Sequence, residues 1–332
     1  MNLFFKIALF FLFSFHFCFL SGQNMRADSI AFLLKGHEEQ DTAKVNLYIK
    51  LALNIYYTDT DTVKALAQSA FELSEKLNYK QGIANSQRVF GIYYDIKANY
   101  PKALEYYHKA LRIAEEIGDK KIISDCLNSI GIIYTDQGNP AEAKVYFEKA
   151  LVIYKELGYI SDVSDCYNNL GVVYYDLKQI DKSLEYYLKS IDNYKKLNNE
   201  GGIALVLNNI GEIYRDKGDY DLALDYFNGA LAISKRIGDI YGVSYLYMDI
   251  ASVYILTEEY TRANVFAQMS MQIALEKDYF DIQKNVYLQL ATIHKNLGDY
   301  KEAYENHVIH KRLNDSLYNE KDLEKRISLE YH

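Results

Sequence analysis

The feature that most constrains this chain is a sequence repeat with a period of about 40 residues, a length typical of repeat arrays. Residues 126–136 read CLNSIGIIYTD, and residues 166–176 read CYNNLGVVYYD. In linear arrays of this kind each copy packs mainly against its neighbours. One small residue per copy holds the same register at Gly91, Gly131, Gly171, Gly211, Ala251 and Ala291.

Each period carries the signals for two α-helices. The recurring small residues mark positions where two helices approach closely. Pro101 and Pro140 stand where a second helix would begin, a position at which a missing N–H is not needed. Residue types that suit the left-handed backbone just past a helix end close the periods at Asn78, Gly118, Gly158, Asn198, Gly238 and Asp278. Since the chain has only 2 prolines in 332 residues, it is predicted to be all-α.

The pattern resembles the tetratricopeptide repeat. The matching residues in one copy are Tyr167, Leu170, Gly171, Tyr174, Ser183, Tyr187 and Ser190, and in the next copy Leu207, Ile210, Gly211, Tyr214, Ala223, Phe227 and Ala230. The resemblance implies a right-handed α-solenoid of stacked antiparallel helix pairs. The period seen here exceeds the usual length of the family's unit, so each helix is expected to be longer by almost one turn. Kinesin light chains have similarly lengthened repeats.

Four segments are predicted along the chain. Residues 1–22 contain Lys6 and then an apolar run from Ile7 to Leu20, which is typical of a secretory signal peptide, with an uncleaved N-terminal anchor as the alternative. Residues 23–43 are expected to form a short helix, Ser29 to Lys35, and a linker. Residues 44–321 form the array of about seven helical hairpins, and residues 322–332 begin a charged C-terminal helix. The leader predicts export to the periplasm or cell envelope, with membrane contact only if the leader stays attached.

The first helix of each pair lines a concave groove in tetratricopeptide arrays, which places the candidate binding residues by resemblance. An asparagine amide offers a donor and an acceptor, so a row of asparagines could bind the backbone of an extended peptide. The alternative for Asn128, Asn168 and Asn208 is a hydrogen bond to a neighbouring helix that fixes hairpin stacking. The candidate groove residues are Asn128, Asn168, Asn169, Tyr175, Asn208, Asn209 and Arg215.

The charge of the chain indicates which partners it would accept. The formal net charge is −8, and no basic run is present, which argues against nucleic-acid binding. Only Arg88 and Arg215 are basic among the groove positions, which argues against a clamp for a C-terminal carboxylate. An acidic groove favours a basic or neutral protein or peptide. The acidic residues assigned to it are Asp125, Asp136, Asp165, Asp176, Glu212 and Asp216.

No residue constellation in the sequence indicates catalysis, and no cofactor or metal is predicted. Cys126 and Cys166 hold equivalent positions in adjacent copies, about 10 Å apart if helices pack normally, which is too far for a disulfide. They are therefore predicted to be free, packed thiols. His294, His307 and His310 fall within one hairpin, but surface histidines of a terminal repeat are the better interpretation. Phosphate-binding loops and zinc-protease motifs are absent from the sequence.

Two functions remain open at this stage. The first is a non-catalytic scaffold that binds an extended segment in the groove. The alternative is the N-terminal sensory part of a truncated envelope sensor, a histidine kinase or transcriptional regulator, which the leader, array and charged helix resemble. In both cases the C-terminal helix, with a narrow apolar stripe including Leu313 and Leu317, could support self-association.

Overall fold

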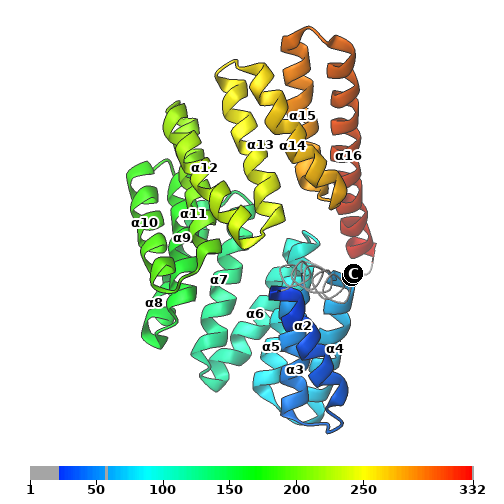
Figure 1. The fold of residues 1–332 in the computed structure, drawn as a ribbon. Helices are drawn as coiled ribbons and strands as arrows, with labels where there is room; N and C mark the ends of the chain where they lie inside the picture. Colours follow the sequence, from blue (N-terminus) through cyan, green and yellow to red (C-terminus); the bar gives the residue numbers. More distant parts are fainter. Residues whose placement is uncertain (1–21, 57–58, 331–332) are drawn as a thin grey trace, which may run out of the picture. The chain divides into compact units, whose positions relative to one another are not determined.

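The computed structural model describes residues 22–56 and 59–330, with side chains from residue 27 to residue 315 of those ranges. Over these residues the backbone forms fifteen α-helices and no β-strand (Figure 1), which confirms the predicted all-α solenoid class. None of the described helices is long and apolar enough to cross a membrane. The predicted leader lies outside the described residues, except for Gly22.

The helices are short and similar in length apart from the last. They are α2 (Gly22–Gly36), α3 (Thr42–Ile55), α4 (Thr60–Lys76), α5 (Lys80–Ile96), α6 (Tyr100–Ile117), α7 (Lys120–Asp136), α8 (Pro140–Leu157), α9 (Ile160–Asp176), α10 (Ile180–Lys196), α11 (Glu200–Asp216), α12 (Tyr220–Ile237), α13 (Ile240–Leu256), α14 (Tyr260–Glu276), α15 (Phe280–Leu297) and α16 (Tyr300–Glu330).

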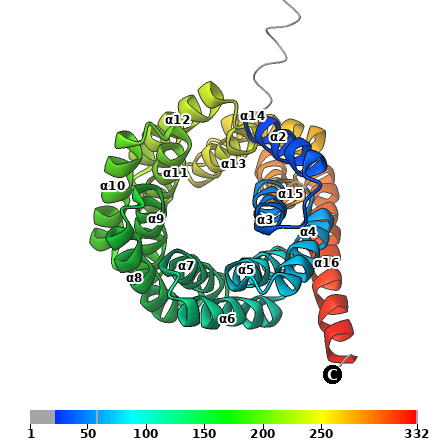
Figure 2. The ribbon, with the colours of Figure 1, turned by 90° about the horizontal axis from the view of Figure 1, so that it is seen from below.

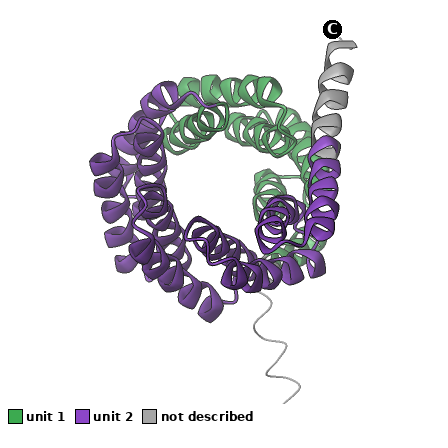
Figure 3. Cartoon of the chain, turned by 90° about the horizontal axis from the view of Figure 1, so that it is seen from above, with its two compact units in different colours: residues 1–137 green, residues 138–332 purple. Residues whose placement is uncertain are grey.

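The helices belong to two compact units (Figure 3). Unit 1 ends at Gln137 and holds α2 to α7, and unit 2 begins at Gly138 and holds α8 to α16. Within each unit, every helix packs against the next helix in the chain. The first helices of the pairs also pack directly on one another, α3 on α5 and α5 on α7 in unit 1, and α9, α11, α13 and α15 in succession in unit 2. Figure 2 shows the result in unit 2, where α9, α11 and α13 lie on the inner side of the curve and α10 and α12 lie outside.

The helix ends follow the predicted register. After α6 the chain turns at Gly118, which has a φ of 70° and donates its N–H to Glu115 O at 3.2 Å. The turns between the two helices of a pair have the same left-handed backbone conformation, with a φ of 60° at Lys178 and 80° at Gly218. Pro101 and Pro140 stand in the first turns of α6 and α8, as predicted.

The small residue of each copy lies where the two helices of a pair meet. A Cβ built on Gly91 would lie 2.5 Å from Tyr107 Cδ1, and one built on Gly211 would lie 2.6 Å from Phe227 Cε1. Atoms this close overlap, so only glycine fits between these helices without a shift. The predicted reason for the glycine register is confirmed at these positions.

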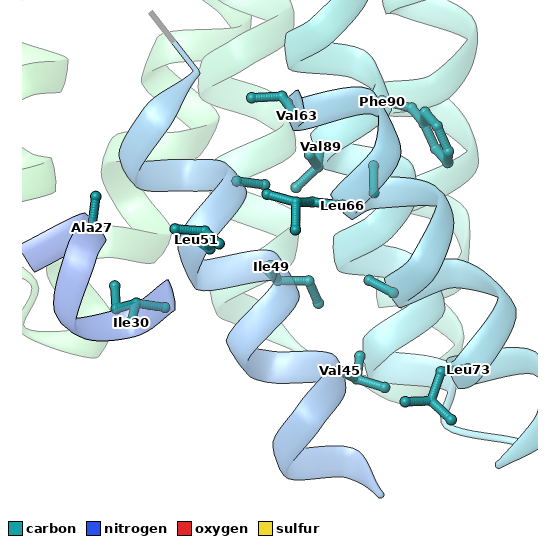
Figure 4. Close-up of a cluster of buried hydrophobic side chains, with 13 residues drawn as sticks. Ala27, Ile30, Val45, Ile49, Leu51, Val63, Leu66, Leu73, Val89 and Phe90 are labelled. Atoms are coloured by element: carbon teal, nitrogen blue, oxygen red, sulfur yellow. The ribbon is translucent and has the colours of Figure 1, made fainter. Parts of the chain in front are cut away.

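Helix α2 begins earlier than expected and covers the start of the array. It runs from Gly22 to Gly36, where the sequence predicted a helix from Ser29 to Lys35. Ala27 and Ile30 are buried in a cluster with Leu51 of α3 (Figure 4), and these apolar contacts extend the helix toward its N-terminus.

The last helix is continuous across the boundary expected at residue 322. Helix α16 runs for 31 residues from Tyr300 to Glu330, so the final helix of the array and the charged C-terminal helix are one element. The sequence between them has neither proline nor glycine, and nothing in it would end a helix. The stripe beyond Asp315 lies outside the residues whose side chains are described.

Candidate functional site

The first helices of unit 2 present the candidate binding surface, which we call the inner face. Polar positions recur on α11 three or four residues apart, and this spacing places them on one side of a helix. Asn168 and Asn208 are almost fully buried, with exposed fractions of 7% and 8%. The residues that define the inner face are Asn168, Asn169, Tyr175, Asn208, Asn209, Glu212, Arg215, Asp216, Tyr245, Asp249 and Gln289.

Hydrogen bonds connect successive hairpins along this face. Asn209 Nδ2 donates to Asn168 Oδ1 at 2.9 Å, and the two residues are 41 positions apart. Gln289 Nε2 donates to the backbone oxygen of Met248 at 3.0 Å, again 41 positions away. For Asn168 this is a hydrogen bond to a neighbouring hairpin, the alternative that the sequence left open, and its donor is Asn209, which the sequence assigned to peptide contact.

The sequence-based prediction missed two residues of this face, Asp249 and Gln289. Asp249 follows Asn209 by one repeat period, just as Asn209 follows Asn169, and Gln289 continues the series. Carrying the period into the next copies would have found both. Asp249 is 4% exposed, and Arg215 Nη1 lies 3.5 Å from Asp249 Oδ1.

Arg215 is shared between two carboxylates. Its Nε lies 2.9 Å from Asp216 Oδ1, and the hydroxyl of Tyr175 donates to Asp216 Oδ2. Burial raises the pKa of Asp216, but the Tyr175 hydrogen bond and the Arg215 guanidinium outweigh burial and bring that pKa below its ordinary value. Asp216 is therefore held as a carboxylate by Arg215 and Tyr175.

At the other two acids of the cluster, burial outweighs the support from Arg215 and from the Asn208 amide. Burial, and secondarily the charge of Glu212, raises the pKa of Asp249 to about 8 although Arg215 opposes the shift. Burial also raises the pKa of Glu212. These two carboxyl groups resist ionisation chiefly because burial removes them from water, and Arg215 offsets that cost only in part.

Three side-chain oxygens on three successive inner-face helices accept no hydrogen bond within the described part of the chain, although each is buried. They are Asn208 Oδ1 on α11, Asp249 Oδ2 on α13 and Gln289 Oε1 on α15. A buried acceptor without a donor costs about 1–3 kcal/mol. Such groups are rare in folded proteins, and each calls for a physical explanation.

Arg88, the other basic residue among the predicted groove positions, lies in unit 1 and is paired with Asp125. Arg88 Nη1 lies 3.6 Å from Asp125 Oδ2, and both side chains are largely buried. Asn128 lies on α7 of the same unit and is partly buried. Arg88 therefore does not present its charge to a ligand, in agreement with the argument against a carboxylate clamp.

His294 and His310 of the last hairpin have different polar partners, and the His307 ring lies 6.3 Å from that of His310. His310 Nδ1 hydrogen-bonds with Lys284 O at 2.8 Å, and His294 Nδ1 lies 3.5 Å from Asp299 Oδ2. A compact group with metal-ligand types occurs elsewhere in the described residues, at His37, Glu39 and Asp41. There Asp41 caps α3 by accepting from Lys44 N at 2.9 Å, so the cluster has a structural role.

Both predicted thiols are buried. Cys126 and Cys166 are 0% exposed, which confirms that they are packed in the core. Burial raises the pKa of the Cys126 thiol to about 12. A thiol in this state is a weak nucleophile, since the thiolate is the reactive form.

The helix pairs and their inner face define an array protein of the α-solenoid class. Models of the tetratricopeptide repeat match residues 83–156, 123–196 and 202–276, and a further model with the same description matches residues 285–306. Because these matches cover more than half of the chain, the chain belongs to the tetratricopeptide repeat family. A search of the curated proteins gave no match.

Several solved structures have a similar fold at low sequence identity. A Rap protein complexed with competence and sporulation factor has a TM-score of 0.63 and 17% identity, covering 89% of this chain and 92% of that one. NprR in complex with its cognate peptide NprX has a TM-score of 0.60 and 19% identity, covering 92% and 94%. BtubC from P. vanneervenii has a TM-score of 0.55 and 22% identity, covering 67% and 93%.

Proposed function

We propose that the inner face of unit 2 binds an extended peptide, or an extended segment of a partner protein, without chemically changing it. The observation that carries the proposal is the set of three buried acceptors without partners, Asn208 Oδ1, Asp249 Oδ2 and Gln289 Oε1. They lie on α11, α13 and α15, which pack in succession. If these side chains turn toward a peptide lying along the helices, its N–H groups would donate to the three oxygens, and binding would offset the cost of leaving them unpaired.

Family membership and the similar structures support this function. Tetratricopeptide arrays present a surface of repeated helix pairs that suits elongated ligands. The Rap protein structure is a complex with competence and sporulation factor, and the NprR structure is a complex with its cognate peptide NprX. The fold is shared with both, so a peptide is the ligand class we propose for this chain.

The charge of the inner face favours a basic or neutral segment. Asp216 balances Arg215, and Glu212 and Asp249 are acids that a positive charge on the ligand would help to ionise, whereas a negative charge would not be matched. Charge of this kind affects association rate and partner choice more than affinity. The face would therefore discriminate against acidic peptides.

We also propose that the protein acts outside the cytoplasm, because residues 1–22 have the pattern of a secretory leader.

A second candidate function is the sensory part of an envelope signalling protein. The continuous α16, which is 31 residues long and much longer than the other described helices, favours it as a helix that could transmit a signal. Reading the gene beyond the His332 codon tests this candidate, which requires a membrane span and an output domain downstream.

The binding function can be tested with peptides selected on the purified protein. Random dodecapeptides displayed on phage would be selected on the protein, and the recovered peptides would be measured by fluorescence anisotropy. Asn208→Leu and Gln289→Leu remove unpartnered oxygens of the inner face, and we expect each to weaken binding about tenfold, or about 1.4 kcal/mol. Asn228→Leu on the exposed side of α12 is the matched control. Peptides that bind all variants equally would place the site elsewhere.

A further inference from the structure

We infer that Asn208, Glu212 and Asp249 form a subsite for one cationic side chain of the bound segment, a lysine ammonium or an arginine guanidinium. The inference rests on the proposed peptide-binding function and names the chemistry at one point of the same face. The three residues come from neighbouring helices, Asn208 and Glu212 from α11 and Asp249 from α13.

The subsite offers open acceptors, and its own donors, the Asn208 amide and the Arg215 guanidinium, already face carboxyl groups. Asn208 and Asp249 are each more than nine-tenths buried, and Asn208 Oδ1 and Asp249 Oδ2 have no hydrogen-bond partner in the described part of the chain. The Asn208 amide donor is already directed at Glu212 Oε1, at 3.5 Å. An ammonium supplies three N–H donors and a guanidinium five, and neither accepts a hydrogen bond. These two groups therefore fit a site whose unpartnered atoms are Asn208 Oδ1 and, once Asp249 is ionised, Asp249 Oδ2.

The charges around the subsite also favour a cationic side chain. Arg215 is the cation that contacts this cluster, and its closest carboxylate is Asp216, 2.9 Å from Nε, whereas Asp249 is 3.5 Å from Nη1. Asp249 and Glu212 retain raised pKa values, chiefly because of burial. A second positive charge beside them would favour ionisation of both carboxyl groups. The ligand's charge would thus be matched by acids that the protein itself leaves under-compensated.

An organic cation fits these residues better than a metal ion. Among the described residues, three metal-type ligand atoms lie within 4.8 Å of one another at His37, Glu39 and Asp41, and the Asp249 cluster is not such a group. The unpartnered amide oxygen of Asn208 calls for an N–H donor, which a lysine or arginine side chain provides.

The test compares peptides that differ only in one charged group. Three fluorescein-labelled dodecapeptide pools would carry lysine, arginine or norleucine at one fixed central position, with Gly, Ser, Asn and Leu randomised elsewhere. Norleucine keeps the lysine methylenes and removes the charge and the donors. Anisotropy titrations would use the full chain and the variants Asp249→Asn and Glu212→Gln. Asp225→Asn, which removes an exposed acid from the outer helix α12, is the control for net charge.

We expect the lysine and arginine pools to bind the wild-type protein at least about tenfold more tightly than the norleucine pool. This preference should fall to about threefold or less in Asp249→Asn and Glu212→Gln, and persist in Asp225→Asn. Circular dichroism would confirm that each variant is folded, and the two site variants test the subsite independently. Equal binding of all three pools to the wild type would overturn the subsite and leave peptide binding standing. Absence of binding by every pool would overturn both.

Discussion

Gly171 of α9 lies directly against the ring of Tyr187 of α10, and a Cβ added to the glycine would lie 2.5 Å from Tyr187 Cδ1. Tyr187 is 2% exposed and cannot swing into solvent without leaving the core. The same relationship joins Gly91 to Tyr107 and Gly211 to Phe227. The repeat therefore encodes the same contact between the two helices in these three pairs.

The first prediction is that Gly171→Ala destabilises the protein. The added methyl overlaps the Tyr187 ring, and relieving this overlap costs about 1–3 kcal/mol in the free energy of unfolding. Gly229→Ala is the control, because the nearest atom to its new Cβ is Leu207 Cδ1 at 3.8 Å. This change should raise stability by up to about 1 kcal/mol through helix propensity. Urea unfolding followed by circular dichroism measures both, and opposite signs are expected.

The second prediction concerns the bond between hairpins. Asn209→Ala removes the donor to Asn168 Oδ1 and leaves that oxygen without it in a largely buried position, which should cost about 1–3 kcal/mol. Asn228→Ala removes an amide whose bond is to Leu224 O on the exposed side of one helix. It should change stability by less than about 0.5 kcal/mol. If the two alanine variants unfold at the same urea concentration, the link between hairpins does not stabilise the array.

A third prediction uses the left-handed turns. Glu258 has a φ of 61° at a register position that Gly218 fills in the preceding copy, with a φ of 80°. A non-glycine residue there costs about 1 kcal/mol, so Glu258→Gly should raise the thermal midpoint. Gly218→Ala should lower it by a similar amount. A midpoint that falls in Glu258→Gly would show that the Glu258 side chain contributes more than the backbone strain costs.

The repeat period predicted much of this fold from the sequence. Helix ends at positions such as Gly118, the glycine contacts such as Gly171, and the buried thiols all follow from residue type and register. These features are local, or repeat between adjacent helices, so periodicity alone determines them. The start of α2 was missed because it depends on packing against α3, whereas the continuity of α16 was already indicated by the absence of proline and glycine from residues 300–330.

The candidate site was less predictable. The repeat register predicted that Asn168, Asn209 and Arg215 lie on one face. It did not predict that the Asn209 amide would donate a hydrogen bond to Asn168. It also left out Asp249, whose raised pKa depends on burial and on Glu212 of the neighbouring helix. Such contacts depend on how far one helix is rotated against the next, and a sequence period does not determine that rotation.

The fourth prediction concerns the two thiols. Cys126 and Cys166 are fully buried, and burial raises the pKa of Cys126 to about 12. In a chain carrying Cys18→Ser, neither thiol should react with Ellman's reagent at pH 8 while the protein is folded. Both should react in 8 M urea. Rapid reaction of either thiol in the folded protein would contradict the packing at that position, and failure of either to react in urea would indicate a disulfide.

The last prediction is that Asp249 makes the protein less stable as pH rises. The pKa of Asp249 is about 8 in the folded protein and about 3.8 in the unfolded chain. Between these values the unfolded chain releases the proton while the folded protein retains it, so the free energy of unfolding falls with increasing pH. Asp249→Asn carries no such proton. The free energy of unfolding of Asp249→Asn should therefore increase relative to that of the wild type between pH 4 and pH 8, by an amount on the order of a few kcal/mol.

The groups facing Asp249 set the size of this effect. Glu212 raises the pKa of Asp249, and Arg215 lowers it. The Asp249 charge in turn raises the pKa of Tyr245, which lies on the same helix. All of these groups remain in Asp249→Asn, so their direct contribution largely cancels when the variant is compared with the wild type. Asp225→Asn on the exposed side of α12 should show a difference that hardly varies with pH. Urea unfolding at pH 4.5, 6 and 8 measures each difference, and a gap that stays constant for Asp249→Asn would mean that Asp249 is ionised in the folded protein throughout this range.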